Sequence, residues 1–142
     1  MYFRQYFNDV LRIVCRMIRV MPCECVLDLE RRWVRCRGWG VVTYDEALAS
    51  RLKFTSDPNF TPDFYQLYDG REITRVCISA SETGQLAMEA VFSPRSRRAL
   101  VAPDRETYDF GRMFQIYRGI NAHKDQVRLF RTIEEAEAWL SS

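Results

Sequence analysis

Two serines near the middle of the chain place a reactive hydroxyl at the start of a predicted helix. Ser79 and Glu82 have the spacing of a capping box, in which the serine accepts a hydrogen bond from a helix amide. The same amides and the positive end of the helix dipole would stabilise a phosphoryl group on Ser79 or Ser81. Because nearly every helix end needs a cap, the pattern favours the structural role, and regulatory phosphorylation is the alternative.

A carboxylate precedes these serines at the predicted end of a strand. Residues 64–68 form a short aromatic-rich run, Asp69 follows it, and Gly70 predicts a turn. Ligands of open α/β folds tend to bind beside the carboxyl ends of strands, so Asp69 is the polar candidate at such an end. The sequence has no nucleophile-elbow, phosphate-loop or zinc-protease motif, and we predict a non-enzymatic protein without a cofactor.

Cysteines and the single histidine are the residues that could bind a transition metal. Cys23 and Cys25 are closer together than the cysteine pairs of structural zinc sites, and His123 lies in a separate loop. Two cysteines at i and i+2 of a strand share a face, which predicts core residues and no metal site. The chain has five cysteines and no secretory signal, a combination typical of free thiols in the cytoplasm.

Aromatic side chains gather near the predicted strand ends and around the helix that covers them. Packing in the core accounts for most of them. If the helices beside the third and fourth strands are separated, the same side chains would line an apolar cleft for a lipid or another apolar small molecule. The candidates for this cleft are Trp39, Phe54, Phe60, Phe64, Tyr108, Phe110 and Phe114.

Residues 1–22 form a predicted amphipathic extension ahead of a single domain over residues 23–142. Apolar residues recur at helical spacing on one face, and arginines lie on the other. Such a helix packs on its own domain or a second subunit, or lies on a membrane surface. Alternatively, Met21 is the natural start of the chain. The residues for the partner or membrane role are Phe3, Phe7, Arg12, Arg16 and Arg19.

Composition and charge limit the class of partner. The 47% hydrophobic and 28% charged content of the 142 residues is that of a soluble globular domain. The net charge is +2, and Arg95, Arg97 and Arg98 form a small basic cluster that we interpret as a solvated turn. We therefore predict no nucleic-acid partner. No apolar run approaches the length of a membrane span.

The order of the predicted elements indicates an α/β fold. Alternating residues over 23–30 and 32–37 predict a β-hairpin that Gly38 and Gly40 close. Helices and strands then alternate to the end of the chain, where Thr132 and Glu135 cap a last helix. This order predicts a mixed sheet of about five strands, parallel in the centre and antiparallel at the hairpin edge, with flanking helices. The exposed hairpin edge also favours a homodimer.

Several of these segments together resemble the SpoIIAA-like bacterial proteins, which are relatives of the STAS domain. The resemblance covers roughly residues 23–140. It includes the hairpin with Gly38-x-Gly40-x-x-Thr43, the strand that ends on Asp69, RRALVAP from Arg97, ETYDFGRMFQIY from Glu106, and the ending VRLFRTIEEAEAWL from Val127.

The resemblance implies a STAS-like sheet with helices, a cytoplasmic setting and a non-enzymatic role as a regulatory, protein-interaction module. STAS domains are switched in some cases by phosphorylation of a serine where a strand passes into a helix, and Ser79 and Ser81 are nearest to that position. The family is also similar in architecture to lipid-transfer domains. Our first hypothesis is therefore a regulatory module with an unknown protein partner. The alternative is a carrier of an apolar ligand, at the inner-membrane surface if residues 1–22 bind there.

Overall fold

The computed structural model describes residues 22–120 and 126–142, which form one α/β unit. The predicted helix over residues 2–20 and His123 lie outside these ranges. The described strands are β1 (Cys23–Asp28), β2 (Trp33–Thr43), β3 (Tyr65–Cys77), β4 (Arg97–Val101) and β5 (Gln126–Phe130). The described helices are α2 (Tyr44–Thr55), α3 (Ala80–Met88), α4 (Arg105–Ile120) and α5 (Ile133–Ser141).

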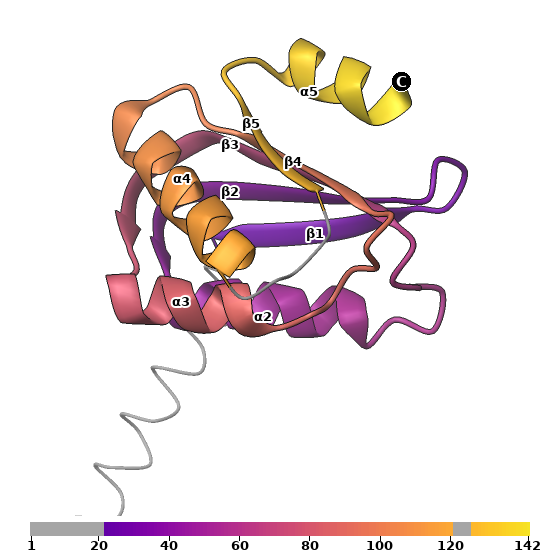
Figure 1. Cartoon of the computed structure of the whole chain (residues 1–142), viewed down its shortest axis with the longest axis horizontal. Helices are drawn as coiled ribbons and strands as arrows, with labels where there is room; N and C mark the ends of the chain where they lie inside the picture. Colours follow the sequence, from indigo (N-terminus) through magenta and orange to yellow (C-terminus); the bar gives the residue numbers. More distant parts are fainter. Residues whose placement is uncertain (1–21, 121–125) are drawn as a thin grey trace, which may run out of the picture.

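The strands form one sheet in the order β1-β2-β3-β4-β5. β1 pairs with β2 in the antiparallel sense, and the remaining neighbours are parallel. Parallel neighbours in sequential order need crossovers of one hand, which place their helices on the same side of the sheet. Accordingly α2, α3 and α4 cover one face and α5 covers the other (Figure 1). The predicted mixed sheet with its antiparallel hairpin edge is confirmed.

Alternation along the strands divides the core between the two faces. Trp33, Leu67 and Ala99 pack with Ala136 and Leu140 of α5. The residues next to them in sequence point to the other face. There Val34 belongs to an aromatic cluster with Phe54 of α2, and Leu100 packs with residues of α3 and α4. Two separate apolar layers therefore lie on either side of one sheet.

Two predicted strand ends are wrong. β2 continues through Gly38 and Gly40 to Thr43, and β3 continues through Gly70 to Cys77. The two strands pair with each other along this extension, with register shifts on both sides of Gly40, whose φ is +61°. Gly70 is needed for close packing and not for a turn, because a Cβ there would lie 2.7 Å from the Val101 carbonyl oxygen. Backbone pairing between distant segments therefore overrides the local turn signals.

Helix starts follow the predicted caps more closely than helix ends do. The Ser79 hydroxyl accepts from the Glu82 amide at 3.1 Å, and the Glu82 carboxylate accepts from the Ser79 amide at 2.9 Å. Glu46 accepts from the Thr43 amide at 2.9 Å. At its other end α3 stops at Met88, where Glu89 has extended backbone, and no local signal in the sequence indicates this end.

The prediction of free thiols is wrong for one pair of cysteines. Cys25 and Cys36 are direct partners in the antiparallel β1–β2 pairing, and they form a disulfide with a Cα–Cα distance of 4.1 Å. Direct antiparallel partners bring two Cβ atoms close enough for such a bond. Among the described residues, Cys23 and Cys77 are free thiols, the first buried and the second exposed.

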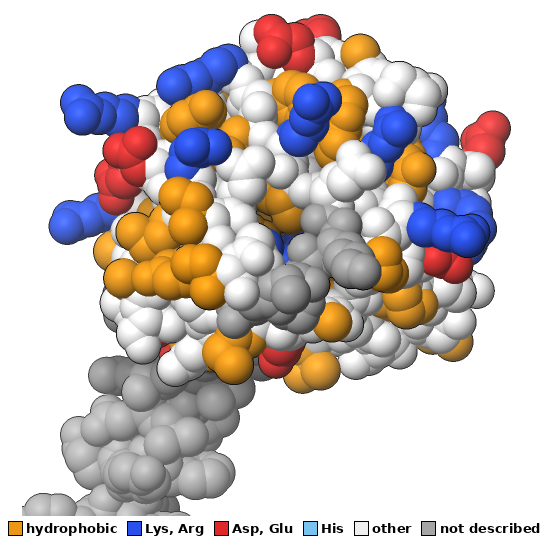
Figure 2. Space-filling model, in the orientation of Figure 1, with side chains coloured by type: hydrophobic (Ala, Val, Ile, Leu, Met, Phe, Trp, Pro, Cys, Tyr) orange, Lys and Arg blue, Asp and Glu red, His pale blue; other side chains and the backbone are white. Residues whose placement is uncertain are grey.

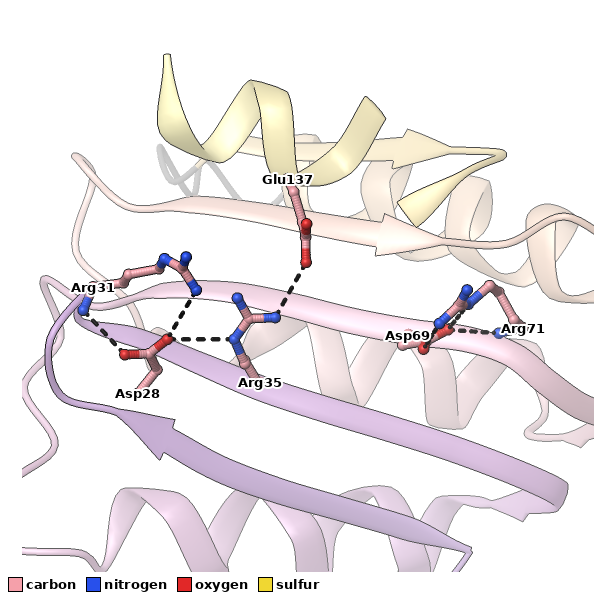
Figure 3. A network of polar contacts seen from close by, with 6 residues as sticks. All are labelled: Asp28, Arg31, Arg35, Asp69, Arg71 and Glu137. Carbon is pink, nitrogen blue, oxygen red and sulfur yellow. Dashed lines mark hydrogen bonds and ion pairs between the residues drawn. The ribbon is translucent and has the colours of Figure 1, made fainter. Parts of the chain in front are cut away.

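A chain of ion pairs links the β1–β2 hairpin to α5. Asp28 contacts Arg31 at 3.6 Å and Arg35 at 3.5 Å, and Arg35 contacts Glu137 of α5 at 3.3 Å (Figure 3).

Within the described ranges, no helix combines the length and apolar character needed to cross a membrane.

Candidate functional site

A cavity of about 100 Å³ lies between the sheet and the three helices α2, α3 and α4. Its walls are mainly apolar, because the strand residues that face these helices are aliphatic at most positions. Ala47 of α2 contributes little volume to the wall. Gly111 of α4 lets this helix pack closely on Leu129 of β5, because a Cβ at Gly111 would clash with the Leu129 side chain. The larger apolar lining residues include Val42, Ile73, Leu86, Leu100, Phe110 and Phe114.

Arg98 brings a guanidinium into this apolar wall. The side chain leaves β4 on the helix-covered face, and the residue is only 6% exposed. Its Nε–H donates to Oε1 of Gln66 at 3.0 Å, and Gln66 is its direct partner in the β3–β4 pairing. The guanidinium carbon lies 4.7 Å from the Phe92 ring centre and 5.2 Å from that of Phe114. Such stacking is favourable for a planar cation in an apolar site.

Two further arginines lie near Arg98. Burial, followed by the charges of Arg51 and Arg118, lowers the pKa of Arg98 well below its ordinary value. Arg118 donates from Nη1 to the carbonyl oxygens of Ala87 at 2.9 Å and Glu89 at 2.7 Å, where α3 ends. Burial and the charge of Arg51 lower the pKa of Arg118 to about 10. Arginine side chains keep their charge in proteins, so three cations lie close together at neutral pH.

Arg51 forms the solvent side of this group. It lines the cavity, its side chain is 13% exposed, and its Nη1 lies 3.0 Å from the carboxylate of Glu89. The term arginine group is used below for Arg51, Arg98 and Arg118. In Figure 2, the molecular surface is hollowed near the middle of the view, and basic atoms are visible inside the hollow below apolar side chains.

Several other polar groups of the wall are bonded within the protein, whereas the buried Thr107 hydroxyl has no hydrogen-bond partner in the described part of the chain. The Gln66 carboxamide donates from Nε2 to the Cys36 sulfur at 3.6 Å, and the Ser50 hydroxyl donates to the Ala47 carbonyl at 3.2 Å. The Tyr68 hydroxyl lies 3.1 Å from the Cys23 sulfur. Burial raises the pKa of both groups, so the phenol and the thiol are protonated at neutral pH.

The structure brings three of the predicted cleft residues to the cavity. Phe54, Phe110 and Phe114 line it. Phe60 and Phe64 lie beside it in the aromatic cluster around Phe54, with ring centres of Phe54 and Phe60 5.3 Å apart.

Trp39 and Tyr108 are not lining residues of the cavity. Trp39 lies under Arg37, with the guanidinium carbon 4.8 Å from the ring centre, and Tyr108 lies under Arg131 at 4.0 Å. Both rings therefore serve as partners of surface arginines.

Asp69 lies within β3 and not at its end, because the strand continues to Cys77. Arg71 holds its carboxylate with two side-chain bonds, from Nε at 2.9 Å and from Nη2 at 2.8 Å (Figure 3). These bonds are the main cause of the lowered pKa of Asp69. The carboxylate is therefore occupied by a structural partner, and it is not part of the cavity wall.

Ser79 and Ser81 both lie at the exposed start of α3, and they have different surroundings. Ser79 is the N-cap, and its hydroxyl is engaged with the Glu82 amide. Ser81 lies in the first turn and is exposed. The predicted membrane or partner residues Phe3, Phe7, Arg12, Arg16 and Arg19 lie outside the described residues.

Sequence reasoning missed the polar residues of the site, Arg98 above all. The prediction that Arg95, Arg97 and Arg98 form a solvated turn is wrong for Arg98, which is buried in β4. The signal that could have found it is alternation, because Arg98 and Leu100 must point to the same face of a strand.

Comparison of the chain with protein-family models, with curated proteins and with solved structures finds no match.

Proposed function

We propose that the protein binds a small apolar molecule in the cavity under α2, α3 and α4, and that it acts by binding and not by catalysis. The observation that carries the proposal is the cavity itself, with mostly apolar walls and a few convergent polar groups. This combination is typical of small-molecule sites. It favours the ligand-binding alternative over a module that only contacts other proteins.

The volume of the cavity limits the size of the ligand that it accepts. A dry cavity of about 150 Å³ holds one benzene molecule. The cavity of about 100 Å³ is smaller, so it has room for a short alkyl group or for the end of a longer chain. A whole lipid would need α2, α3 and α4 to move apart. We therefore propose a short apolar ligand, or a longer one that is only partly enclosed.

Titration with butan-1-ol tests the proposal, with two-dimensional amide NMR spectra as the readout. Saturable shifts of the cavity residues are expected in the wild type. Ala47→Leu fills part of the cavity and should remove these shifts, whereas Ala49→Leu adds the same atoms on α2 outside the wall and should keep them. Absence of saturable shifts in the wild type would refute the proposal. Native mass spectrometry of the purified protein adds a search for a bound ligand.

We also propose a SpoIIAA-like, STAS-like classification and a cytoplasmic location. In the ligand-carrier alternative, residues 1–22 would bind the inner-membrane surface. The segments that support this are the hairpin and the ending from Val127 to Leu140. An order of elements with a hairpin before alternating strands and helices is consistent with it. Homodimer formation and a protein partner remain predictions.

Regulation by phosphorylation is the second proposal. The observation that favours it is the exposure of Ser79 and Ser81 at the start of α3, whose residue Leu86 lines the cavity. A phosphoryl group there would meet the amides of the first turn. Mass spectrometry of protein isolated from its source checks this, and peptides in which neither serine is ever modified would refute it.

A further inference from the structure

We infer that the ligand is a short aliphatic alcohol, whose hydroxyl forms a hydrogen bond with Oγ1 of Thr107 while its alkyl part occupies the apolar cavity. This inference rests on the proposed function, because it assigns the chemical class of the molecule in the same cavity. It adds one polar contact that an apolar cavity alone does not have, and it makes the head group of the ligand neutral.

The Thr107 hydroxyl carries the inference. Thr107 lines the cavity from the first turn of α4, and the residue is only 7% exposed. Within the described ranges, its Oγ1 atom is buried and has no hydrogen-bond partner. A hydroxyl that is buried without a partner destabilises the folded protein, and native structures rarely keep one. A ligand oxygen in the cavity would supply the missing partner.

The other polar side chains considered for the wall already have partners. The arginine group is bonded within the protein, through Gln66 and Glu89. The hydroxyls of Ser50 and Tyr68 have partners as well. In the described part of the chain, Thr107 is therefore the lining residue whose hydroxyl is left for a ligand.

Thr107 lies toward the end of β4, away from Arg98. A Cβ at Gly70 would lie 2.7 Å from the Val101 carbonyl oxygen and 3.2 Å from Cγ2 of Thr107, so these two groups are close together. Val101 is the last residue of β4, and Arg98 lies three positions before it, roughly 10 Å along an extended strand. The alkyl part of an alcohol bound at Thr107 can therefore lie along β4, against aliphatic residues such as Ile73.

The charges around the cavity favour a neutral head group. The Asp104 carboxylate accepts from the Thr107 amide at 3.1 Å. Although burial acts to raise it, contacts from Thr107 lower the pKa of Asp104, so the carboxylate lies near the Thr107 hydroxyl without forming a hydrogen bond of acceptable geometry with it. This carboxylate would repel an anionic head group, and the arginine group would repel a cationic one. An alcohol hydroxyl has no charge and both donates and accepts.

The test compares butan-1-ol with 1-chlorobutane by amide NMR titration of the full chain. The two molecules have the same number of non-hydrogen atoms, and only the alcohol has a hydroxyl. Saturable shifts of the cavity residues are expected for both in the wild type. If neither molecule binds, the proposed function fails. Butyrate and butylammonium add a charge and should bind more weakly than butan-1-ol, so tighter binding of either ion would overturn the inference.

Variants assign the contact to Thr107. Thr107→Val keeps the shape of the side chain and removes its hydroxyl. It should weaken the binding of butan-1-ol about fivefold, as the loss of one neutral hydrogen bond gives, and leave that of 1-chlorobutane unweakened. Thr83→Val is the matched control, because Thr83 is also a buried helical threonine but its hydroxyl donates to the Ser79 carbonyl at 2.8 Å. It should leave both affinities unchanged.

Thermal unfolding without ligand distinguishes the two threonines a second time. Thr107→Val should be at least as stable as wild type, because it removes an unpaired buried hydroxyl. Thr83→Val should unfold at a temperature lower by about 3 °C or more, because it loses a hydrogen bond. A Thr107→Val variant that is less stable than wild type, or does not fold, would show that the hydroxyl has a partner in the protein and would overturn the inference. An unchanged ratio of the two affinities in Thr107→Val overturns it too, and leaves the proposed function standing.

Discussion

The Nε–H of Arg98 donates a hydrogen bond to Oε1 of Gln66 at 3.0 Å, and the two residues are direct partners in the pairing of β4 with β3. Gln66 also donates to the sulfur of Cys36 in β2 at 3.6 Å. Side chains of three neighbouring strands are therefore linked on the face that α2, α3 and α4 cover. Because these atoms are buried, the loss of one partner leaves another polar atom away from water.

Replacing Gln66 by Leu should destabilise the protein by about 2–3 kcal/mol, because a buried hydrogen bond to a charged group is lost. Urea unfolding followed by circular dichroism measures the change. The control is a double-mutant cycle with Arg98→Met, in which the two changes together should cost less than their sum, since neither leaves the other's partner unsatisfied. Additive free energies in that cycle would show that the pair is not coupled.

Alanine at Gly70 and at Gly84 should change the stability in opposite directions, because Gly70 is tightly packed and Gly84 has open space beside it. Gly70→Ala should destabilise the protein by about 1–3 kcal/mol, since the new Cβ would lie 2.7 Å from the Val101 carbonyl oxygen and force a shift. Gly84→Ala should stabilise it by up to about 1 kcal/mol, because Gly84 lies inside α3 with no atom within 4 Å of the new Cβ. Thermal unfolding of both variants gives the comparison. A tolerated Gly70→Ala would refute the close packing of β3 on β4.

The fold was largely predictable from the sequence, because local patterns determine where helices start and which residues alternate. The capping residues Ser79 and Thr132 and the hairpin of β1 and β2 are examples. Strand ends were not predictable in the same way. Gly40 and Gly70 carry a turn signal in isolation, but β2 and β3 continue through them and pair with each other on both sides of the register shifts.

The candidate site was only partly predictable. Apolar residues such as Phe54 and Phe114 were found because aromatic clusters are visible in the sequence. The buried arginine was not found, since Arg98 follows two other basic residues of an apparent surface turn. Its burial depends on Gln66, which is 32 positions away in sequence, and this long-range partner has no local signature. The pairing of Cys25 with Cys36 likewise depends on the register of the hairpin.

Removal of the Cys25–Cys36 disulfide should lower the free energy of unfolding by about 2–3 kcal/mol, the loop-closure value for a short loop. The two cysteines are 11 positions apart. Cys25→Ser is the preferred variant, because it keeps the Cys36 sulfur as a partner of Gln66. Urea unfolding with and without a reducing agent measures the effect, and Cys77→Ser, at an exposed free thiol, is the control. Equal stability of oxidised and reduced wild type would contradict the prediction.

The ion pair of Asp69 with Arg71 predicts a pH dependence with a definite sign. Side-chain hydrogen bonds from Arg71 lower the pKa of Asp69 in the folded state. Stability from this group is therefore present above the pKa of an unfolded aspartate, about 3.9, and is lost as pH falls through the lower folded pKa. Asp69→Asn should be less stable than wild type at pH 7, by about 1 kcal/mol or less, and the difference should shrink in acid.

Urea unfolding at pH values from neutral to about 3 measures this difference. Asp63→Asn removes an exposed carboxylate from the loop before β3 and serves as the control. A gap between wild type and Asp69→Asn that grows as the pH falls would have the wrong sign, and it would remove the role assigned to Arg71.

Variants at the start of α3 distinguish the structural role of Ser79 as a helix cap from its proposed regulatory role. Ser79→Ala removes the acceptor of the Glu82 amide, and it should cost about 1 kcal/mol of unfolding free energy. Ser79→Asp keeps an acceptor and adds a charge that suits the helix start, so its stability should equal or exceed that of wild type. Ser81→Ala, at an exposed position in the first turn, should change stability by less than about 0.5 kcal/mol.

Thermal unfolding of the three variants, combined with butan-1-ol titration, tests both roles. If Ser79 is only a cap, ligand affinity in Ser79→Asp should match wild type, because the charge stays at the surface end of α3. A changed affinity in Ser79→Asp with unchanged stability would instead connect the start of α3 to Leu86 in the cavity wall, as phosphorylation would require. A Ser79→Ala variant as stable as wild type would contradict the cap.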